Sequence, residues 1–132
     1  QGKCEMALEL YEKQLAIQIK AMGEDHPGLA ATYNNIALVY AKDGKYAMAL
    51  EQYGKCLATT IKALGEDHPH VAKTYSNVAA VFAKQGKYAM VLTLYAKTLV
   101  IQIKALGEDH PDVAKTYGNI AKATYNNEMA QV

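Results

Sequence analysis

The chain of 132 residues is built from one sequence unit that occurs three times. The block Gly-Glu-Asp-His-Pro begins at Gly23, Gly65 and Gly107, at a constant interval of 42 residues. Residues 2–43 match residues 44–85 at 26 of 42 positions, and residues 44–85 match residues 86–127 at 25 positions. Self-similarity at a fixed period of this length is typical of repeat arrays, in which each unit packs on its neighbours. We therefore expect residues 1–132 to form a single array with units 2–43, 44–85 and 86–127.

Apolar residues within a unit follow the period of an α-helix. In the second unit they recur at steps of mostly three or four, which predicts a helix over residues 46–64; they are Tyr46, Ala49, Leu50, Tyr53, Leu57, Ile61 and Leu64. Gly65 is suited to the left-handed conformation that ends a helix, and Pro69 to the first turn of the next one. That next helix ends before Gly86, so each unit is expected to contain an antiparallel helical hairpin.

The register of the units leaves one unpaired helix at each end of the chain. Residues 2–22 match the second helix of a unit, and residues 111–127 match a first helix, which gives six helices in total. Each end helix could complete a hairpin with the other end of a neighbouring molecule, so head-to-tail self-association is one expected partnership. Lys122 and Thr124 replace apolar residues of the earlier units, and we expect them to give the last helix a more polar outer face.

Charge and composition exclude several classes of protein. All 14 basic residues are lysines and they nearly balance the 13 acidic residues, whereas nucleic-acid binders usually carry a basic face with arginines. The longest apolar run, residues 78–83, is far shorter than the roughly 20 residues that span a bilayer. We therefore expect neither a nucleic-acid nor a membrane partner. Two cysteines, Cys4 and Cys56, favour a reduced, cytoplasmic setting. The first residue, Gln1, indicates a fragment of a longer protein.

No pattern in the sequence points to catalysis, a metal or a cofactor. His26, His68 and His110 each follow Glu-Asp, a combination that can bind metals. They recur because the linker recurs, and successive linkers should lie roughly 10 Å or more apart, too far to share one ion. Phosphate-binding glycine motifs and nucleophile elbows are missing from the sequence. We expect no enzyme activity, no metal site and no cofactor.

The repeated motif resembles the tetratricopeptide repeat. The residues that carry this resemblance are Thr-Tyr-x-Asn-[Ile/Val]-Ala, followed by [Tyr/Phe]-Ala-Lys-x-Gly-Lys-Tyr-Ala-Met in the first two units. The 42-residue period with its Leu-Gly-Glu-Asp-His-Pro linker is similar to the variant found in kinesin light chains. The resemblance implies an all-α fold of tandem antiparallel hairpins that coil into a right-handed superhelix.

Two functions of different classes are compatible with this resemblance. The first is a protein–protein interaction scaffold whose concave surface, lined by the first helices, binds an extended peptide. The alternative is a structural or self-associating array that stacks end to end without a peptide ligand.

The predicted peptide groove centres on three asparagines at intervals of 42 residues. Asparagine amides both donate and accept hydrogen bonds, so a row of them can pair with a peptide backbone. Kinesin light chains are similar here, since they hold cargo peptides with asparagines at this place in the motif. Lysines one turn earlier would favour an acidic peptide with micromolar affinity. The residues expected to line the groove are Asn34, Asn35, Leu38, Lys73, Asn77, Ala80, Lys115 and Asn119.

Overall fold

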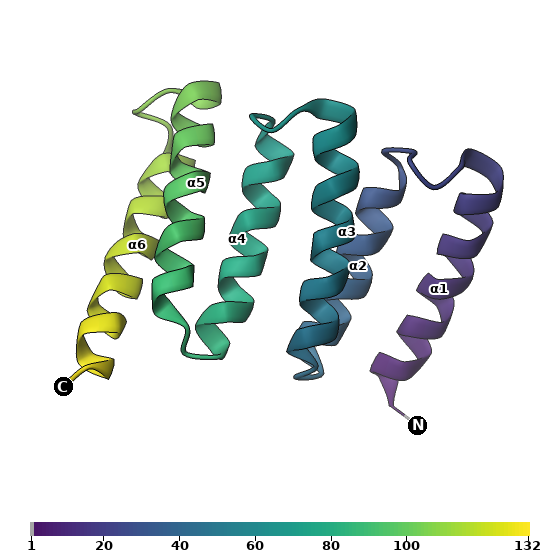
Figure 1. Cartoon of the computed structure of the whole chain (residues 1–132), viewed down its shortest axis with the longest axis horizontal. Helices are drawn as coiled ribbons and strands as arrows, with labels where there is room; N and C mark the ends of the chain where they lie inside the picture. The colour runs from purple at the N-terminus through teal and green to yellow at the C-terminus, as the bar shows by residue number, and fades with distance from the viewer. Residues whose placement is uncertain (1) are drawn as a thin grey trace. The chain divides into compact units, whose positions relative to one another are not determined.

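A computed structural model describes residues 2–132 and contains six α-helices and no strand within that range (Figure 1). About four fifths of the chain, 82%, is helical, which confirms the all-α prediction. The helices are α1 (Lys3–Met22), α2 (Leu29–Lys42), α3 (Tyr46–Leu64), α4 (Pro69–Lys84), α5 (Tyr88–Leu106) and α6 (Pro111–Ala130).

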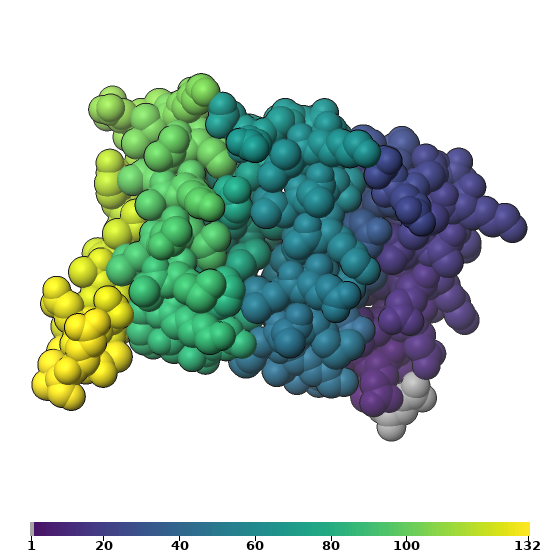
Figure 2. Space-filling model, viewed as in Figure 1, coloured from purple at the N-terminus to yellow at the C-terminus, as the bar shows by residue number. Residues whose placement is uncertain are grey.

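The helices divide into two compact units, each of which we describe by itself. Unit 1 ends at Gly65, and in it α2 packs against both α1 and α3. Unit 2 comprises Glu66–Val132, and in it α5 packs against both α4 and α6. The pairs α2–α3 and α4–α5 are the hairpins predicted from the repeat. Side chains of α4 and α5 close the space between their ribbons on the face shown in Figure 2.

Each hairpin turns at a glycine in the left-handed region. Gly86 has a φ of 75°, and its N–H donates to the carbonyl of Ala83 at 3.0 Å. The N–H of Lys87 donates to the carbonyl of Phe82, also at 3.0 Å. These two bonds form a Schellman motif, which satisfies carbonyls at the end of α4. Gly44 has the same φ of 75° at the end of α2.

The glycine before each Glu-Asp-His-Pro linker has a different conformation. Gly65 has a φ of 91° and a ψ of 162°. The φ is positive, as predicted, but the ψ is that of extended backbone and differs from the left-handed helical conformation that was predicted. This combination is essentially restricted to glycine, and it directs the chain away from the helix into an extended linker.

The linker histidines of unit 2 cap the start of the helices that follow. Nδ1 of His68 accepts a hydrogen bond from the N–H of His70 at 3.1 Å, and Nδ1 of His110 accepts one from Asp112 at 3.0 Å. In unit 1, Nδ1 of His26 accepts one from Gly28 at 2.9 Å, but Gly28 precedes α2, whose start has no side-chain cap. N–H groups in the first turn of a helix have no partner within the helix, so in unit 2 the imidazoles supply the missing acceptors.

One helix end differs from its prediction. The helix over residues 111–127 continues to Ala130 as α6. The residue at the position of Gly44 and Gly86 is Glu128, which has no reason to adopt a positive φ. The helix therefore continues where its repeat equivalents turn.

The helices pack through small apolar cores and a few recurring polar contacts. In unit 1, Leu29, Tyr33 and Cys56 form one buried cluster, and in unit 2 Ala79, Val91 and Ala123 form another. Cys56 is thus a packing residue, and within residues 2–132 neither cysteine forms a disulfide. The hydroxyl of Thr32 donates to Oε1 of Gln18 at 2.7 Å, and that of Thr116 to Oε1 of Gln102 at 2.6 Å. These bonds tie a first helix to the helix that precedes it.

By length and composition alone, α5 is apolar enough to cross a membrane, with a mean hydropathy of 1.4. Core helices of soluble proteins pass the same test, but they are mostly buried, whereas 17% of this apolar window is buried. In this structure α5 packs between α4 and α6, and its two lysines, Lys97 and Lys104, contact Tyr75 and Asp67 of unit 2.

Candidate functional site

Unit 2 contains a groove whose walls are α4 and α6 and whose floor is α5. Two cavities make up this groove, one of about 490 Å³ nearer the start of α4 and one of about 310 Å³ nearer its end. Asn119 lines both cavities, so the two adjoin at the middle of α6. The whole groove lies within residues 69–126.

The larger cavity is lined mostly by polar residues, although apolar atoms make up slightly more than half of its surface. Lys73 and Asn77 of α4 line one wall, and Lys115 and Asn119 of α6 line the other. Gln102 lines the cavity from α5, and its side-chain oxygen already accepts the Thr116 hydroxyl hydrogen bond. Both lysines are exposed, so their charges are accessible to solvent or to a ligand. Both asparagines are half-buried.

The smaller cavity is mainly apolar. Ala80, Ala83, Val91, Tyr95 and Ala123 line it together with the aliphatic stems and charged ends of two lysines. Burial raises the pKa of the Tyr95 phenol, so its hydroxyl stays protonated even at more alkaline pH than an exposed tyrosine and can donate a hydrogen bond. A cavity of this kind suits one apolar side chain of a ligand.

The groove residues follow one stripe on each wall. On α4 the stripe is Lys73, Asn77, Ala80 and Lys84, and on α6 it is Lys115, Asn119, Lys122 and Asn126. The steps of four, three and four residues keep each set on one face of its helix. Two equivalent helices of the repeat therefore present equivalent faces to the same space.

The residues that line the groove carry a higher net positive charge than the chain as a whole. Four lysines line the two cavities, and the only carboxylate that lines them is that of Asp112. The whole chain, by contrast, has a formal net charge of +1. Positive charge is thus concentrated on the walls of the groove, where it favours an anionic ligand.

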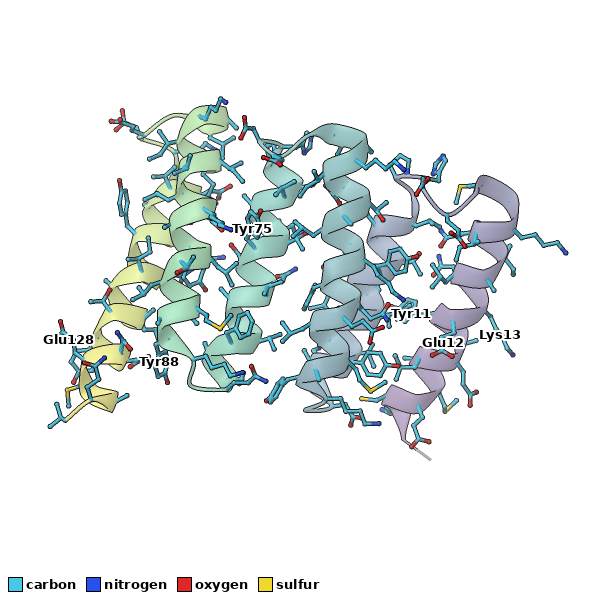
Figure 3. All side chains as sticks on the ribbon, viewed as in Figure 1. Tyr11, Glu12, Lys13, Tyr75, Tyr88 and Glu128 are labelled. Atoms are coloured by element: carbon cyan, nitrogen blue, oxygen red, sulfur yellow. The ribbon has the colours of Figure 1, made fainter. Side chains whose placement is uncertain are left out.

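The structure brings together five of the eight residues predicted to line the groove, namely Lys73, Asn77, Ala80, Lys115 and Asn119. The other three, Asn34, Asn35 and Leu38, belong to α2 in unit 1. Of the three asparagines predicted to form a row, Asn77 and Asn119 therefore lie in this groove, and Asn35 lies in unit 1. Tyr75 lies outside the groove, against α5, with Nζ of Lys97 5.6 Å from its ring (Figure 3).

One residue lies on a different surface from the one predicted, and several groove residues were not predicted. Lys122 was expected on the polar outer face of the last helix, but it lines the groove. Lys122 and Asn126 lie three and seven residues after Asn119. The helical period therefore places them on the same face as Asn119, and both could have been predicted to line the groove. The floor residues, such as Tyr95 and Gln102, could not be assigned because the sequence does not state which side of α5 faces the groove.

Among residues 2–132, no three His, Cys, Asp or Glu side chains gather in a way that could hold a metal ion. His68 and His70 do lie together, with ring centroids 4.8 Å apart, but Nδ1 of His68 is engaged in capping α4.

Comparison with known proteins agrees with this architecture. A family model for the tetratricopeptide repeat matches residues 1–60, 29–99 and 70–127. The chain belongs to the tetratricopeptide repeat family. Such repeats form scaffolds that generally mediate protein–protein interactions, and their fold is typically non-catalytic. A search of curated protein sequences returns no match.

Solved structures that resemble this tetratricopeptide repeat chain contain repeats of the kinesin light chain type. One is the crystal structure of nearly identical repeats from Podospora anserina, named as a candidate kinesin light chain; it is 27% identical with a TM-score of 0.81. Another is BtubC (BKLC) from P. vanneervenii, which at 24% identity and a TM-score of 0.82 shows the fold alone. Each match covers 98% of this chain, but only 62% and 53% of the two neighbours.

Proposed function

We propose that the groove of unit 2 binds an extended peptide segment of another protein that carries acidic residues and at least one apolar side chain. The observation that carries this proposal is the joining of a lysine- and asparagine-lined cavity to an apolar one along a single groove. Acidic side chains would contact Lys73 and Lys115, and the apolar side chain would enter the cavity floored by Val91.

The asparagines supply recognition that does not depend on the ligand's side chains. Asn77 and Asn119 line the groove from opposite walls, and Asn119 lines both cavities. An amide has both donors and an acceptor, so Asn119 can pair with the N–H and C=O of a peptide unit. Asn77 also takes part in an interaction within the chain. Because the chain contains no arginine, the lysines act as flexible point charges and we expect micromolar affinity.

The test uses fluorescent peptides of about ten residues that combine one large apolar residue with two glutamates at varied spacing, and measures binding by anisotropy. We expect Asn119→Ala to weaken the tightest peptide by about 1–2 kcal/mol, roughly 5- to 30-fold. Lys115→Gln should weaken binding and flatten its dependence on salt, because a charge has been removed from the groove.

Matched controls separate the groove from the rest of the chain. Asn127→Ala removes an amide from α6 that lines neither cavity, and Lys3→Gln removes a charge from unit 1. Both controls should leave affinity unchanged. If Asn119→Ala lowers the melting temperature strongly while binding persists, the asparagines are structural and the proposal is wrong. Equal binding of peptides with lysine in place of glutamate would also contradict it.

A further inference from the structure

The two lysines on the walls of the larger cavity have no acidic partner within the described chain. The lysines near the ends of α3 and α5 pair with linker aspartates, whereas among residues 2–132 neither Lys73 nor Lys115 forms an ion pair. Both side chains belong to exposed residues that line the same cavity. Two positive charges at one cavity repel each other, and an anion bound between them removes that repulsion.

The two lysines occupy equivalent positions on opposite walls of the groove. They lie 42 residues apart, which is the repeat period, and they come from α4 and α6. The equivalent residue of α2 is Ala31, and α2 packs against α3 in a hairpin of the same kind. The hairpin therefore forms without a charge at this position, which favours a role in binding for the lysines.

Uncharged hydrogen-bond donors line the same cavity. They are the hydroxyl of Ser76 and the amides of Asn77 and Asn119. Lysine ammonium groups only donate hydrogen bonds, and hydroxyl and amide groups donate as well as accept. Asn77 also has an interaction within the chain, so we assign the neutral donors of the ligand site to Ser76 and Asn119. This set of donors suits a ligand group with several acceptor oxygens.

We propose that the acidic group held between Lys73 and Lys115 is a phosphorylated side chain of the bound peptide. This inference rests on the peptide-binding function proposed above and specifies the chemistry of the group that the larger cavity binds. A phosphate monoester carries a charge of about −1.5 to −2 at neutral pH and has three acceptor oxygens. One such group can therefore neutralise both lysines and still accept a hydrogen bond from a hydroxyl or an amide. A carboxylate carries a single charge and can neutralise only one of them.

The absence of arginine strengthens the case for a dianion. Arginine binds carboxylates through two parallel hydrogen bonds that match their planar geometry. The chain contains no arginine, and the cations of this cavity are lysines. Because the lysine ammonium acts as a point charge, recognition depends mainly on the total charge of the ligand. A doubly charged group then gains more from the two lysines than a singly charged one.

The two cavities also set the spacing of the ligand's residues. On α6, Lys115 lines the larger cavity and Lys122 the smaller one. Seven residues of helix rise by about 10 Å, which an extended peptide covers in about three residues. We therefore place the phosphorylated residue about three positions from the apolar residue that enters the smaller cavity.

Asp112 opposes an anion in the larger cavity. Its carboxylate is the single one lining the cavity in the described chain, and its Oδ2 lies 3.8 Å from Nδ1 of His110. Repulsion grows with the charge of the ligand, so it is stronger for a phosphate than for a carboxylate. Asp112→Asn should therefore raise the affinity of a phosphorylated peptide more than that of an acidic one. A misfolded variant cannot mimic this result, because the expected change is a gain.

Three peptides that differ at one position test the proposal. Each has about ten residues with one large apolar side chain and, about three positions before or after it, serine, glutamate or phosphoserine. Anisotropy is measured at a pH of about 7.5, where the phosphate is mostly dianionic. We expect the phosphoserine peptide to bind the full chain about tenfold more tightly than the glutamate peptide. The serine peptide should bind more weakly than either.

The ratio of the phosphoserine and glutamate affinities is the decisive measurement in the variants. Lys73→Gln and Lys115→Gln each remove one of the two charges, so the preference should fall from about tenfold to about twofold or less. Lys84→Gln is the matched control, because Lys84 is also on α4 but lines the smaller cavity. It should weaken both peptides by the same factor and leave the preference unchanged. Circular dichroism should show that all variants remain equally helical.

The outcomes separate this inference from the proposed function. If none of the peptides binds, both are wrong. If the glutamate and phosphoserine peptides bind equally well, the peptide-binding function stands and the phosphate inference is overturned. It is also overturned if Lys84→Gln abolishes the preference as fully as Lys73→Gln does. Inorganic phosphate added to the serine peptide should not restore tight binding; if it does, the cavity binds a free anion and the phosphorylated residue is not its ligand.

Discussion

At the residue scale, the linker histidines show a structural role for a side chain that recurs in every repeat. Each imidazole accepts a hydrogen bond from the backbone N–H two residues later. In unit 2 that N–H lies in the first turn of the next helix, and in unit 1 it belongs to Gly28, just before α2. Asparagine, aspartate and serine are the usual residues at such a cap, and their oxygens do what Nδ1 does here. The repetition of His beside Glu-Asp therefore reflects helix initiation.

This role predicts the effect of substitutions at His68. We expect His68→Ala to lower the free energy of unfolding by about 1 kcal/mol, because the N–H of His70 loses its acceptor. The conservative change His68→Asn should retain most of the stability, since its side-chain oxygen can accept the same bond. Urea unfolding followed by circular dichroism measures both.

A control at the neighbouring histidine distinguishes the cap from the ring contact. His70→Ala removes the ring that lies 4.8 Å from that of His68 but keeps the backbone donor. It should therefore cost less than His68→Ala. If the two alanine variants are equally destabilised and His68→Asn is no better, the contact between the rings matters and the cap does not.

At the element scale, the helix boundaries were largely predictable because glycine and proline mark them in each unit. The helix predicted over residues 46–64 has those bounds in the structure. The end of α6 was predicted wrongly. The prediction placed it where the earlier units turn at a glycine, but Glu128 occupies that position in the last unit. The groove walls follow from the helical period, but the floor depends on how α5 is rotated against its neighbours, which no local pattern in the sequence specifies.

The two kinds of glycine in this chain predict opposite effects of one substitution. A Cβ at Gly86 or at Gly54 would meet no atom within 4 Å, so space does not distinguish them. Gly86 has a φ of 75°, and an alanine there should cost roughly 1–2 kcal/mol. Gly54 lies inside α3, where alanine should add about 0.5–1 kcal/mol of stability.

Thermal and urea unfolding of the two variants check this prediction. The repeat supplies an internal precedent, because the position of Gly54 is held by Ala96 in α5. A loss of stability in Gly54→Ala would show that α3 needs a flexible or open position there, and would contradict the argument from helix propensity.

At the scale of the whole molecule, the two units contain equivalent helix faces that differ in charge. The face of α4 that lines the groove has its counterpart on α2, where Asn35 and Leu38 occupy the positions of Asn77 and Ala80. Lys73, however, corresponds to Ala31, so the equivalent face in unit 1 has one positive charge fewer at this position. An acidic peptide should therefore bind unit 2 in preference to unit 1.

One substitution in each unit tests this preference. A peptide of about six residues spans roughly 20 Å, comparable to the length of α4, and can be held within unit 2 alone. Its affinity should fall roughly 5- to 30-fold in Asn119→Ala and should not change in Asn35→Ala. If Asn35→Ala weakens this peptide as much as Asn119→Ala does, the acidic peptide does not distinguish the two units, and Lys73 does not direct it to unit 2.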